Sequence, residues 1–380
     1  MRLKTQRSWL TLFTGLLLLS GTALFALGCS SDKDSASNEM GMGTAEDYAM
    51  VITTDYQTGS ISTIHLADRR ITKNLQTIHP DAVCRYDPIT KRPFIVARNS
   101  SDAVEVIDQQ NGWNVMKEYS VGAGSNPQDI AVVTAERAYI PRFNSATMAI
   151  VHPTQGQSLG TVDLSRFADP DGVPEMASAV QQQGLIYVAV QRLSNLNPTD
   201  YSSIVVINGQ TSKVEAEVKL TGKNPYAKLR YNATLDRIVV GETGAFGKLD
   251  GGVEYLDPAT RSVGGFVITE ESLGGDLNDV VILSKTKGYA LTSKSVDGNT
   301  FPTSVVSFNP TTGKKLADLA VGKSLEHAFL ELTPDGSQLW VADRNPTAPG
   351  VIIFDTADDR LITDTPLDVG LPPSMICFMR

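Results

Sequence analysis

The sequence has 380 residues, with 33 Lys and Arg against 42 Asp and Glu, three Cys, four His and a formal net charge of −9. An acidic chain of this kind argues against nucleic acid as a partner, because phosphate binding requires clustered basic side chains. The sequence has no C-x-x-C spacing and no Cys/His cluster. This excludes c-type haem, iron–sulfur and structural zinc sites.

The first 28 residues are predicted to be an export signal. Arg2, Lys4 and Arg7 form a basic start, and an almost uncharged apolar run follows from Trp9 to Leu27. A run of this length could instead span a bilayer as an uncleaved anchor, which is the alternative. The basic start, the Leu-rich middle, the small residues before Cys29 and the abrupt change to polar sequence favour the export signal.

Residues Phe25 to Cys29, FALGC, resemble the lipobox of bacterial lipoproteins, with Ala26 where Leu is usual. The resemblance implies that Cys29 is lipidated and that Ser30 directs the protein to the outer membrane. Removing residues 1–28 takes away three of the 33 basic residues and no acidic one, so the net charge falls from −9 to about −12. Residues 29–46 have too few apolar side chains to form a core, so we expect a flexible tether.

From residue 47 onward, short apolar runs alternate with turns. Runs of four to seven residues rich in Val, Ile, Leu and aromatics are separated by Gly, Pro, Asp or Asn, which is typical of short antiparallel strands. In the last copy the strands are expected at Leu339 to Ala342 and Val351 to Phe354, with a further strand closed by Val369 and Gly370.

This pattern recurs seven times, which predicts a seven-bladed β-propeller. One strand follows Pro80, Pro127 and Pro174, which are 47 residues apart. Four strands in each of seven units predict an all-β propeller over residues 47–380. In five copies an Asp or Asn ends the third strand, because its side chain can accept hydrogen bonds from the following turn: Asp108, Asn208, Asp257, Asn309 and Asp355.

The two ends of the domain are expected to share one blade. The chain starts with the second strand of a unit at Tyr48 and finishes with a lone first strand, Met375 to Phe378, so pairing them removes a free sheet edge. Cys84 and Cys377 occupy the same repeat position in neighbouring blades. A disulfide between them is left open, since such positions are commonly farther apart than the ~4.4 to 6.8 Å Cα separation that a disulfide requires.

Several segments resemble the repeats of YVTN-type β-propellers, within the wider quinoprotein-like group. They are Asn126-Pro-Gln-Asp-Ile-Ala-Val, Leu339-Trp-Val-Ala-Asp, Ile353-Phe-Asp-Thr and Asp368-Val-Gly. The resemblance covers essentially the whole domain. It implies the fold strongly and the function little, because relatives include surface-layer, periplasmic binding and scaffold proteins as well as enzymes. Only Trp113 and Trp340 remain after residue 28, too few for the tryptophan docking motif of quinone-dependent propeller dehydrogenases.

The loops that enter first strands and those that leave second strands are expected on one face, around the channel mouth. One interpretation of their charges is a ring of ion pairs, each contributing about 0 to 1 kcal/mol. The other is a charged funnel that binds an anionic or zwitterionic ligand or a partner's side chains. Five of the seven blades place a Lys or Arg at the end of the second strand, whereas the fifth blade has Glu242 there. The candidate ligand-binding residues are Arg98, Arg142, Arg192, Lys294, Arg344, Asp81, Asp129, Glu175 and Asp279.

Metal sites have little support in the sequence. His65 and His152 occupy the Asp/Asn turn column, and His79 and His327 lie on mouth loops of blades that are not adjacent. The segment Asp169-Pro-Asp-Gly lacks the further ligands of a helix-loop-helix calcium site, although a looser calcium site stays open. We expect no other cofactor.

The first hypothesis is a monomeric lipoprotein of the outer membrane, whose propeller binds an envelope protein, an envelope polymer or a small anionic ligand. The alternative is a metal-dependent lactonase-like or lyase-like hydrolase, with a divalent cation held by Glu175 and Asp279. A third hypothesis is a structural envelope component or an accessory of a surface electron-transfer complex. No nucleophile elbow, zinc-protease motif or P-loop favours an enzyme.

Overall fold

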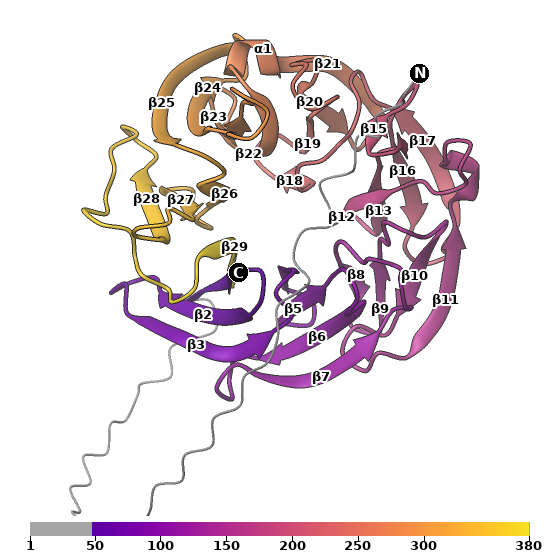
Figure 1. Cartoon of the computed structure of the whole chain (residues 1–380). Coiled ribbons are helices and arrows are strands. Elements are labelled where there is room, and N and C mark those ends of the chain that lie inside the picture. Colours follow the sequence, from indigo (N-terminus) through magenta and orange to yellow (C-terminus); the bar gives the residue numbers. More distant parts are fainter. Residues whose placement is uncertain (1–47, 380) are drawn as a thin grey trace, which may run out of the picture. The chain divides into compact units, whose positions relative to one another are not determined.

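A computed structural model describes residues 48–379. The predicted signal (1–28) and tether (29–46) lie outside the described residues. Within residues 48–379 the chain is nearly all β and forms seven sheets arranged in a ring (Figure 1). The predicted seven-bladed β-propeller is therefore confirmed.

Apart from β29, the strands of the first four blades lie in the described chain up to residue 219. Blade 1 contains β29 (Pro373–Phe378), β1 (Tyr48–Thr54), β2 (Gly59–His65) and β3 (Ile71–Ile78). Blade 2 contains β4 (Ala82–Asp87), β5 (Arg92–Ala97), β6 (Ala103–Asp108) and β7 (Asn114–Ser120). Blade 3 contains β8 (Ala131–Thr134), β9 (Arg137–Ile140), β10 (Thr147–Val151) and β11 (Ser158–Asp163), followed by a short 3-10 helix (Ser165–Phe167). Blade 4 contains β12 (Met176–Gln182), β13 (Leu185–Val190), β16 (Ser203–Asn208) and β17 (Val214–Lys219), with a small hairpin of β14 (Leu193–Ser194) and β15 (Asn197–Pro198).

The last three blades complete the ring. Blade 5 contains β18 (Arg230–Asn232), β19 (Arg237–Glu242), β20 (Gly252–Asp257) and β21 (Ser262–Thr269), followed by α1 (Glu270–Leu273). Blade 6 contains β22 (Asp276–Ser284), β23 (Lys287–Ser293), β24 (Thr303–Asn309) and β25 (Lys314–Gly322). Blade 7 contains β26 (His327–Leu332), β27 (Gln338–Asp343) and β28 (Gly350–Asp355).

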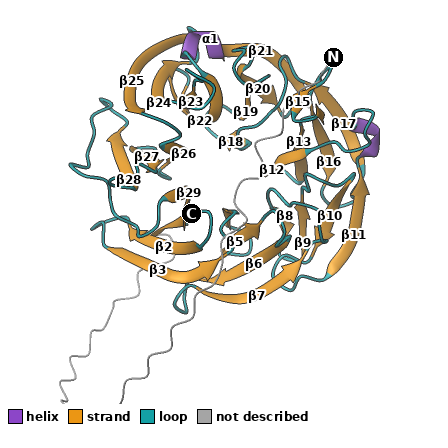
Figure 2. Ribbon diagram, in the orientation of Figure 1, coloured by secondary structure: helices purple, strands orange, loops and turns teal. Residues whose placement is uncertain are grey.

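The composition of each strand follows from its place in the blade. The second and third strands, such as β5 and β6, are buried along most of their length because neighbouring blades cover both of their faces. Continuous apolar runs suit that position. The fourth strands, such as β7, lie at the periphery and are mostly exposed, which explains their polar sequence (Figure 2).

The turn chemistry predicted from the Asp/Asn column is confirmed. In blade 6, Asn309 Oδ1 accepts hydrogen bonds from Thr311 N at 2.9 Å and Thr312 N at 3.2 Å. His65 and His152 also lie in turns, as predicted, since their carbonyls accept from the backbone four residues later. The other members of the column accept in the same way as Asn309: Asp108, Asn208, Asp257 and Asp355.

Blade 7 departs from the prediction of a regular fourth strand. In the described chain, residues 361–367 form only isolated bridges, Phe354 with Leu361 and Val351 with Leu367. The Thr363 side chain accepts from Ile353 N at 3.2 Å in place of a backbone carbonyl. Pro366 has no N–H to donate, which further interrupts the ladder.

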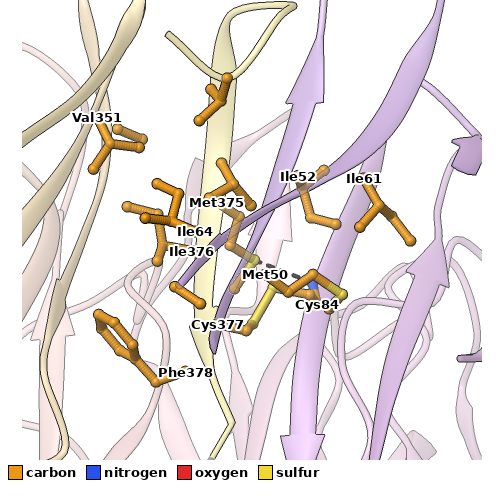
Figure 3. Packing of buried hydrophobic residues seen from close by; sticks show 14 of the residues in the cluster. Met50, Ile52, Ile61, Ile64, Cys84, Val351, Met375, Ile376, Cys377 and Phe378 are labelled. Carbon is orange, nitrogen blue, oxygen red and sulfur yellow. Dashed lines mark hydrogen bonds between the residues drawn. A yellow bond between two sulfur atoms is a disulfide. The ribbon is translucent and has the colours of Figure 1, made fainter. Parts of the chain in front are cut away.

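The two ends of the described chain close the ring. Strand β29 pairs antiparallel with β1, with Cys377 opposite Met50, so the predicted shared blade is confirmed. Cys377 also forms a disulfide with Cys84 of β4, with a Cα–Cα distance of 6.2 Å (Figure 3). The disulfide that the sequence left open is therefore present, and the two positions lie within the range of Cα separations that a disulfide requires.

The disulfide forms because β29 and β4 lie side by side where the blades converge at the centre of the ring. Cys84 N lies 3.2 Å from the Met375 sulfur, so the two innermost strands contact each other directly (Figure 3). The bond spans 293 residues of sequence. It therefore joins almost the whole described chain into one loop.

Reduction of this disulfide is predicted to destabilise the domain by about 2 to 5 kcal/mol, because a long covalent loop restricts the unfolded chain. Thermal unfolding with and without reductant measures the effect. The Cys84→Ser/Cys377→Ser variant is the control and should not respond to reductant. An equal response of the wild type and the variant would contradict the prediction.

Candidate functional site

The loops that enter first strands and those that leave second strands lie together on one face, which we name the mouth face. Backbone hydrogen bonds join the two sets. Arg98 N donates to Asp81 O at 2.9 Å, and Arg344 N donates to Glu326 O at 2.5 Å. This pairing confirms the arrangement that the repeat predicts.

Arg98 makes an ion pair, whereas Arg142 binds backbone. Arg98 Nε donates to Asp81 Oδ1 at 2.8 Å, and Arg98 Nη1 donates to Gln128 Oε1 of the next blade at 3.2 Å. Arg142 Nη1 donates to the carbonyl of Val121 at 2.9 Å. Arg98 and Asp81 thus match the ion-pair interpretation, and Arg142 joins two loops.

The remaining predicted cations do not converge on one point. Arg192 Nη1 donates to the carbonyl of Phe167 at 2.9 Å, within its own corner of the face. Arg344 Nη2 donates to Thr54 O of blade 1 at 3.0 Å and so links blades 7 and 1. Lys294 is exposed. The five basic residues therefore surround the mouth at separate places.

Three of the predicted acids are buried: Asp129, Asp279 and Glu175. Asp129 and Asp279 line the mouth cavity, whereas Glu175 does not, and its Oε2 accepts from Leu193 N at 2.9 Å. Burial raises the pKa of Glu175 to about 7, with the nearby Asp171 carboxylate adding to the effect.

Asp129 forms a clamp that joins three blades. Arg85 of blade 2 makes a bidentate pair with it, through Nε at 3.0 Å and through Nη2. Arg85 Nη2 also donates to Ala179 O of blade 4 at 3.0 Å, and Ala179 N donates back to Asp129 Oδ2 at 3.2 Å. Burial alone would raise the pKa of Asp129, but Arg85 holds it below its usual range.

Asp279 forms an equivalent clamp three blades farther on. Arg230 of blade 5 pairs with it through Nη1 at 2.6 Å and Nη2 at 3.1 Å. Arg230 Nη2 donates to Leu330 O of blade 7 at 2.9 Å, and Leu330 N donates to Asp279 Oδ2 at 3.1 Å. We name the level of these two Arg–Asp clamps the waist.

Arg85 and Arg230 of the waist pair with two of the candidate site residues, but the sequence analysis did not identify either arginine. A signal is present, because Arg85-Tyr86-Asp87 and Arg230-Tyr231-Asn232 repeat at the same strand position in blades 2 and 5. Each places a charged residue in a buried inner strand. Such a residue calls for a buried partner.

Cavities lie on both sides of the waist. The mouth cavity has a volume of about 250 Å³, and the distal cavity, at the opposite end, has a volume of about 580 Å³. Lys228, which immediately precedes Leu229 and β18, lines both cavities. The mouth cavity combines charged, amide and aromatic side chains, including Arg98, Gln128, Asp129, Phe143, Tyr226 and Phe329.

Exposed apolar side chains gather on the mouth face. Of the twelve large exposed apolar residues found within residues 48–379, six lie on its loops, and each of these is more than half exposed. The rings of Tyr226 and Phe246 pack edge to face with centroids 5.7 Å apart. The six are Tyr56, Leu196, Tyr226, Phe246, Val296 and Leu325.

The histidines of the mouth loops make local contacts. His79 Nδ1 lies 3.0 Å from Asp81 O, and His327 Nδ1 lies 3.0 Å from Thr303 Oγ1. Burial lowers the pKa of His327 to about 4. Over residues 48–379 no group of three or more His, Cys, Asp or Glu residues is arranged to hold a metal ion. In the same part of the chain, no helix is sufficiently long and apolar to cross a membrane.

Comparisons with known proteins support the fold. Neither a protein-family model nor a curated protein sequence matches this chain. A proposed 6-phosphogluconolactonase from Bacteroides uniformis aligns with a TM-score of 0.62 and 14% identity, covering 87% of this chain and 99% of its own. A second, from Bacteroides fragilis, aligns with a TM-score of 0.61 and 14% identity over 88% and 98% of the two chains. Hydrazine synthase from Kuenenia stuttgartiensis aligns with a TM-score of 0.60 and 16% identity, covering 79% of this chain and 91% of its own. At these identities the likeness establishes the fold alone.

The sequence placed Glu242 of blade 5 among the charged residues around the channel mouth. In the structure its side chain is fully buried. Burial, together with the neighbouring Glu254 carboxylate, raises the pKa of Glu242 from 4.5 to about 10. The folded protein therefore holds a proton that the unfolded chain releases. This contribution to the free energy of unfolding is complete below pH 4.5 and is lost as the pH rises toward about 10.

Glu242→Gln is predicted to increase the free energy of unfolding at neutral to alkaline pH by about 1 to 3 kcal/mol, because folding no longer requires proton uptake. The increase should shrink as the pH falls toward the ordinary carboxyl range. Chemical denaturation across this pH range measures it. Glu271→Gln, at an exposed position, is the control, and a pH-independent effect of Glu242→Gln would disprove the assignment.

Proposed function

We propose that this chain is a lipid-anchored envelope protein whose β-propeller binds a partner protein through the mouth face. The observation that carries the proposal is that six exposed apolar side chains lie on the loops of that face, one of which, Tyr226, lines the mouth cavity. Exposed apolar groups gathered on one face favour a protein contact. The lipobox-like FALGC segment supports anchoring through Cys29.

The residue types suit an interface. Aromatic residues and arginine contribute most to the binding energy of protein interfaces. On the mouth face, the Arg344 guanidinium lies 4.6 Å from the ring of Tyr56, and Tyr226 borders the cavity that Arg98 also lines. Exposed Lys294 adds a positive charge at the rim. A partner with an acidic or aromatic side chain fits this combination.

The enzyme alternative has less support in the contacts. A divalent cation held by Glu175 and Asp279 requires both carboxylates to be available. Asp279 is bound by Arg230 in a bidentate pair, and Glu175 accepts from Leu193 N. The two acids also belong to blades 4 and 6, which are not adjacent.

Site-specific crosslinking of the full chain in its native membrane tests the proposal. A photoreactive residue at Phe246 or Leu325 is predicted to yield a discrete crosslinked protein. The same residue at Met116, which is exposed on the peripheral strand β7, is the matched control and should yield none. Tyr226→Ser should weaken the crosslink from Leu325.

Equal crosslinking from Met116 and Phe246 would refute the mouth face as the binding surface. Cys29→Ala separates lipidation from binding, because it removes the thiol that would carry the lipid. Absence of covalently bound lipid on the wild-type protein would refute the lipid anchor without bearing on the face.

A further inference from the structure

Lys228 is the cation at the waist that no carboxylate neutralises directly. Its side chain is half-buried and lies where the mouth cavity meets the distal cavity. Within residues 48–379 its ammonium group makes no hydrogen bond or ion pair. Nζ lies 5.4 Å from the centroid of the Phe329 ring, and the Arg230 guanidinium lies 5.1 Å from the same ring.

The backbone on either side of Lys228 is fixed. Leu229 N donates to Ser178 Oγ at 3.1 Å, and Ser178 Oγ donates to Asp129 Oδ2 at 3.0 Å. Arg230 is fixed by the second clamp. Lys228 therefore stands on backbone that is fixed between the two clamps.

The charges around Lys228 come from five blades. Arg85, Arg230 and, at the mouth cavity, Arg98 are positive, and Asp129, Asp279, Glu331 and, at the distal cavity, Asp335 are negative. Each arginine of the waist is already engaged, Arg85 by Asp129, and Arg230 by Asp279 with Glu331 at 3.6 Å. Blades 1 and 4 contribute only uncharged side chains to the two cavities: Met375, Ser374, Cys377, Phe378, Ala177, Ser178, Val180, Gln181 and Gln191.

We propose that Lys228 anchors a binding site for a small oxyanion, a carboxylate or a phosphate, in the distal cavity. The site lies outside the nine residues predicted from the sequence, and it does not rest on partner binding at the mouth face. A volume of about 580 Å³ accommodates a small molecule, and Gln181 and Thr234 place polar side chains along the wall. The oxyanion would supply the negative charge that Lys228 lacks, in a setting where water screens charges weakly.

Binding should be coupled to proton uptake. Burial, with help from Arg85 and Arg230, lowers the pKa of Lys228 from 10.5 to about 7. The oxyanion binds the protonated amine and so raises this pKa again. Affinity is therefore highest below neutral pH and falls as the pH rises above the pKa of the free protein.

Isothermal titration of the full chain with inorganic phosphate and with citrate tests the proposal. The affinity of the wild type for the probe that binds should fall roughly tenfold or more between about pH 6.5 and about pH 8.5. Lys228→Met should weaken binding at pH 6.5 by at least about tenfold, whereas Lys285→Met, at an exposed turn, should change it less than about twofold. The tighter of the two probes identifies the class of oxyanion.

Lys228→Arg gives an independent check, because a guanidinium keeps its charge throughout this pH range. It should retain binding and remove most of the pH dependence. Thermal unfolding confirms that each variant is folded. Failure of both probes to bind the wild type, or binding that Lys228→Met leaves intact, would overturn the proposal. Loss of partner crosslinking with intact oxyanion binding would instead count only against the proposed function.

Discussion

The two Arg–Asp clamps at the waist are the constraint on which the rest of the propeller depends. Strand ladders hold each blade together, whereas in the described chain no ladder joins one blade to the next. Asp129 and Asp279 each connect three blades, because each accepts a bidentate pair from the preceding blade and a backbone N–H from the following one. Both carboxylates are buried. Loss of either partner would therefore leave an uncompensated charge, at a cost of about 3 to 5 kcal/mol.

Blade 1, which neither clamp reaches, is held by covalent and terminal contacts. The disulfide joins it to blade 2, and Arg344 of blade 7 donates to Thr54 O and Pro372 O on its other side. Ser178 bridges blades 4 and 5. The ring is thus linked at every blade, and the side chains that link it fill the waist and separate the two cavities. The two functional proposals concern other groups. We propose that the exposed apolar side chains of the mouth loops bind a partner protein and that Lys228 binds an oxyanion.

Local turn chemistry made the fold predictable, and long-range pairing made the site less so. Asn309 and Asp355 mark strand ends by bonds to residues two or three positions away, so the repeat could be read from the sequence. The clamps join Arg85 to Asp129 across 44 positions and Arg230 to Asp279 across 49, and no local rule connects those pairs. The same limit applies to Cys84 and Cys377, whose proximity depends on how closely β29 and β4 converge. The sequence showed basic residues at the ends of the second strands. Whether each one contacts a carboxylate, as Arg98 does, or a backbone carbonyl, as Arg142 does, depends on loops that are distant in sequence.

Native-state hydrogen exchange at two amides tests most directly whether the waist is a rigid link between blades. Ala179 N and Leu330 N donate to Asp129 and Asp279. Their protection therefore reports the clamps, whereas that of the buried Val188 amide in β13 reports the core. The account predicts that the two clamp amides exchange as slowly as Val188, through global unfolding alone. Exchange of Ala179 and Leu330 by a faster local opening, with Val188 still protected, would contradict it.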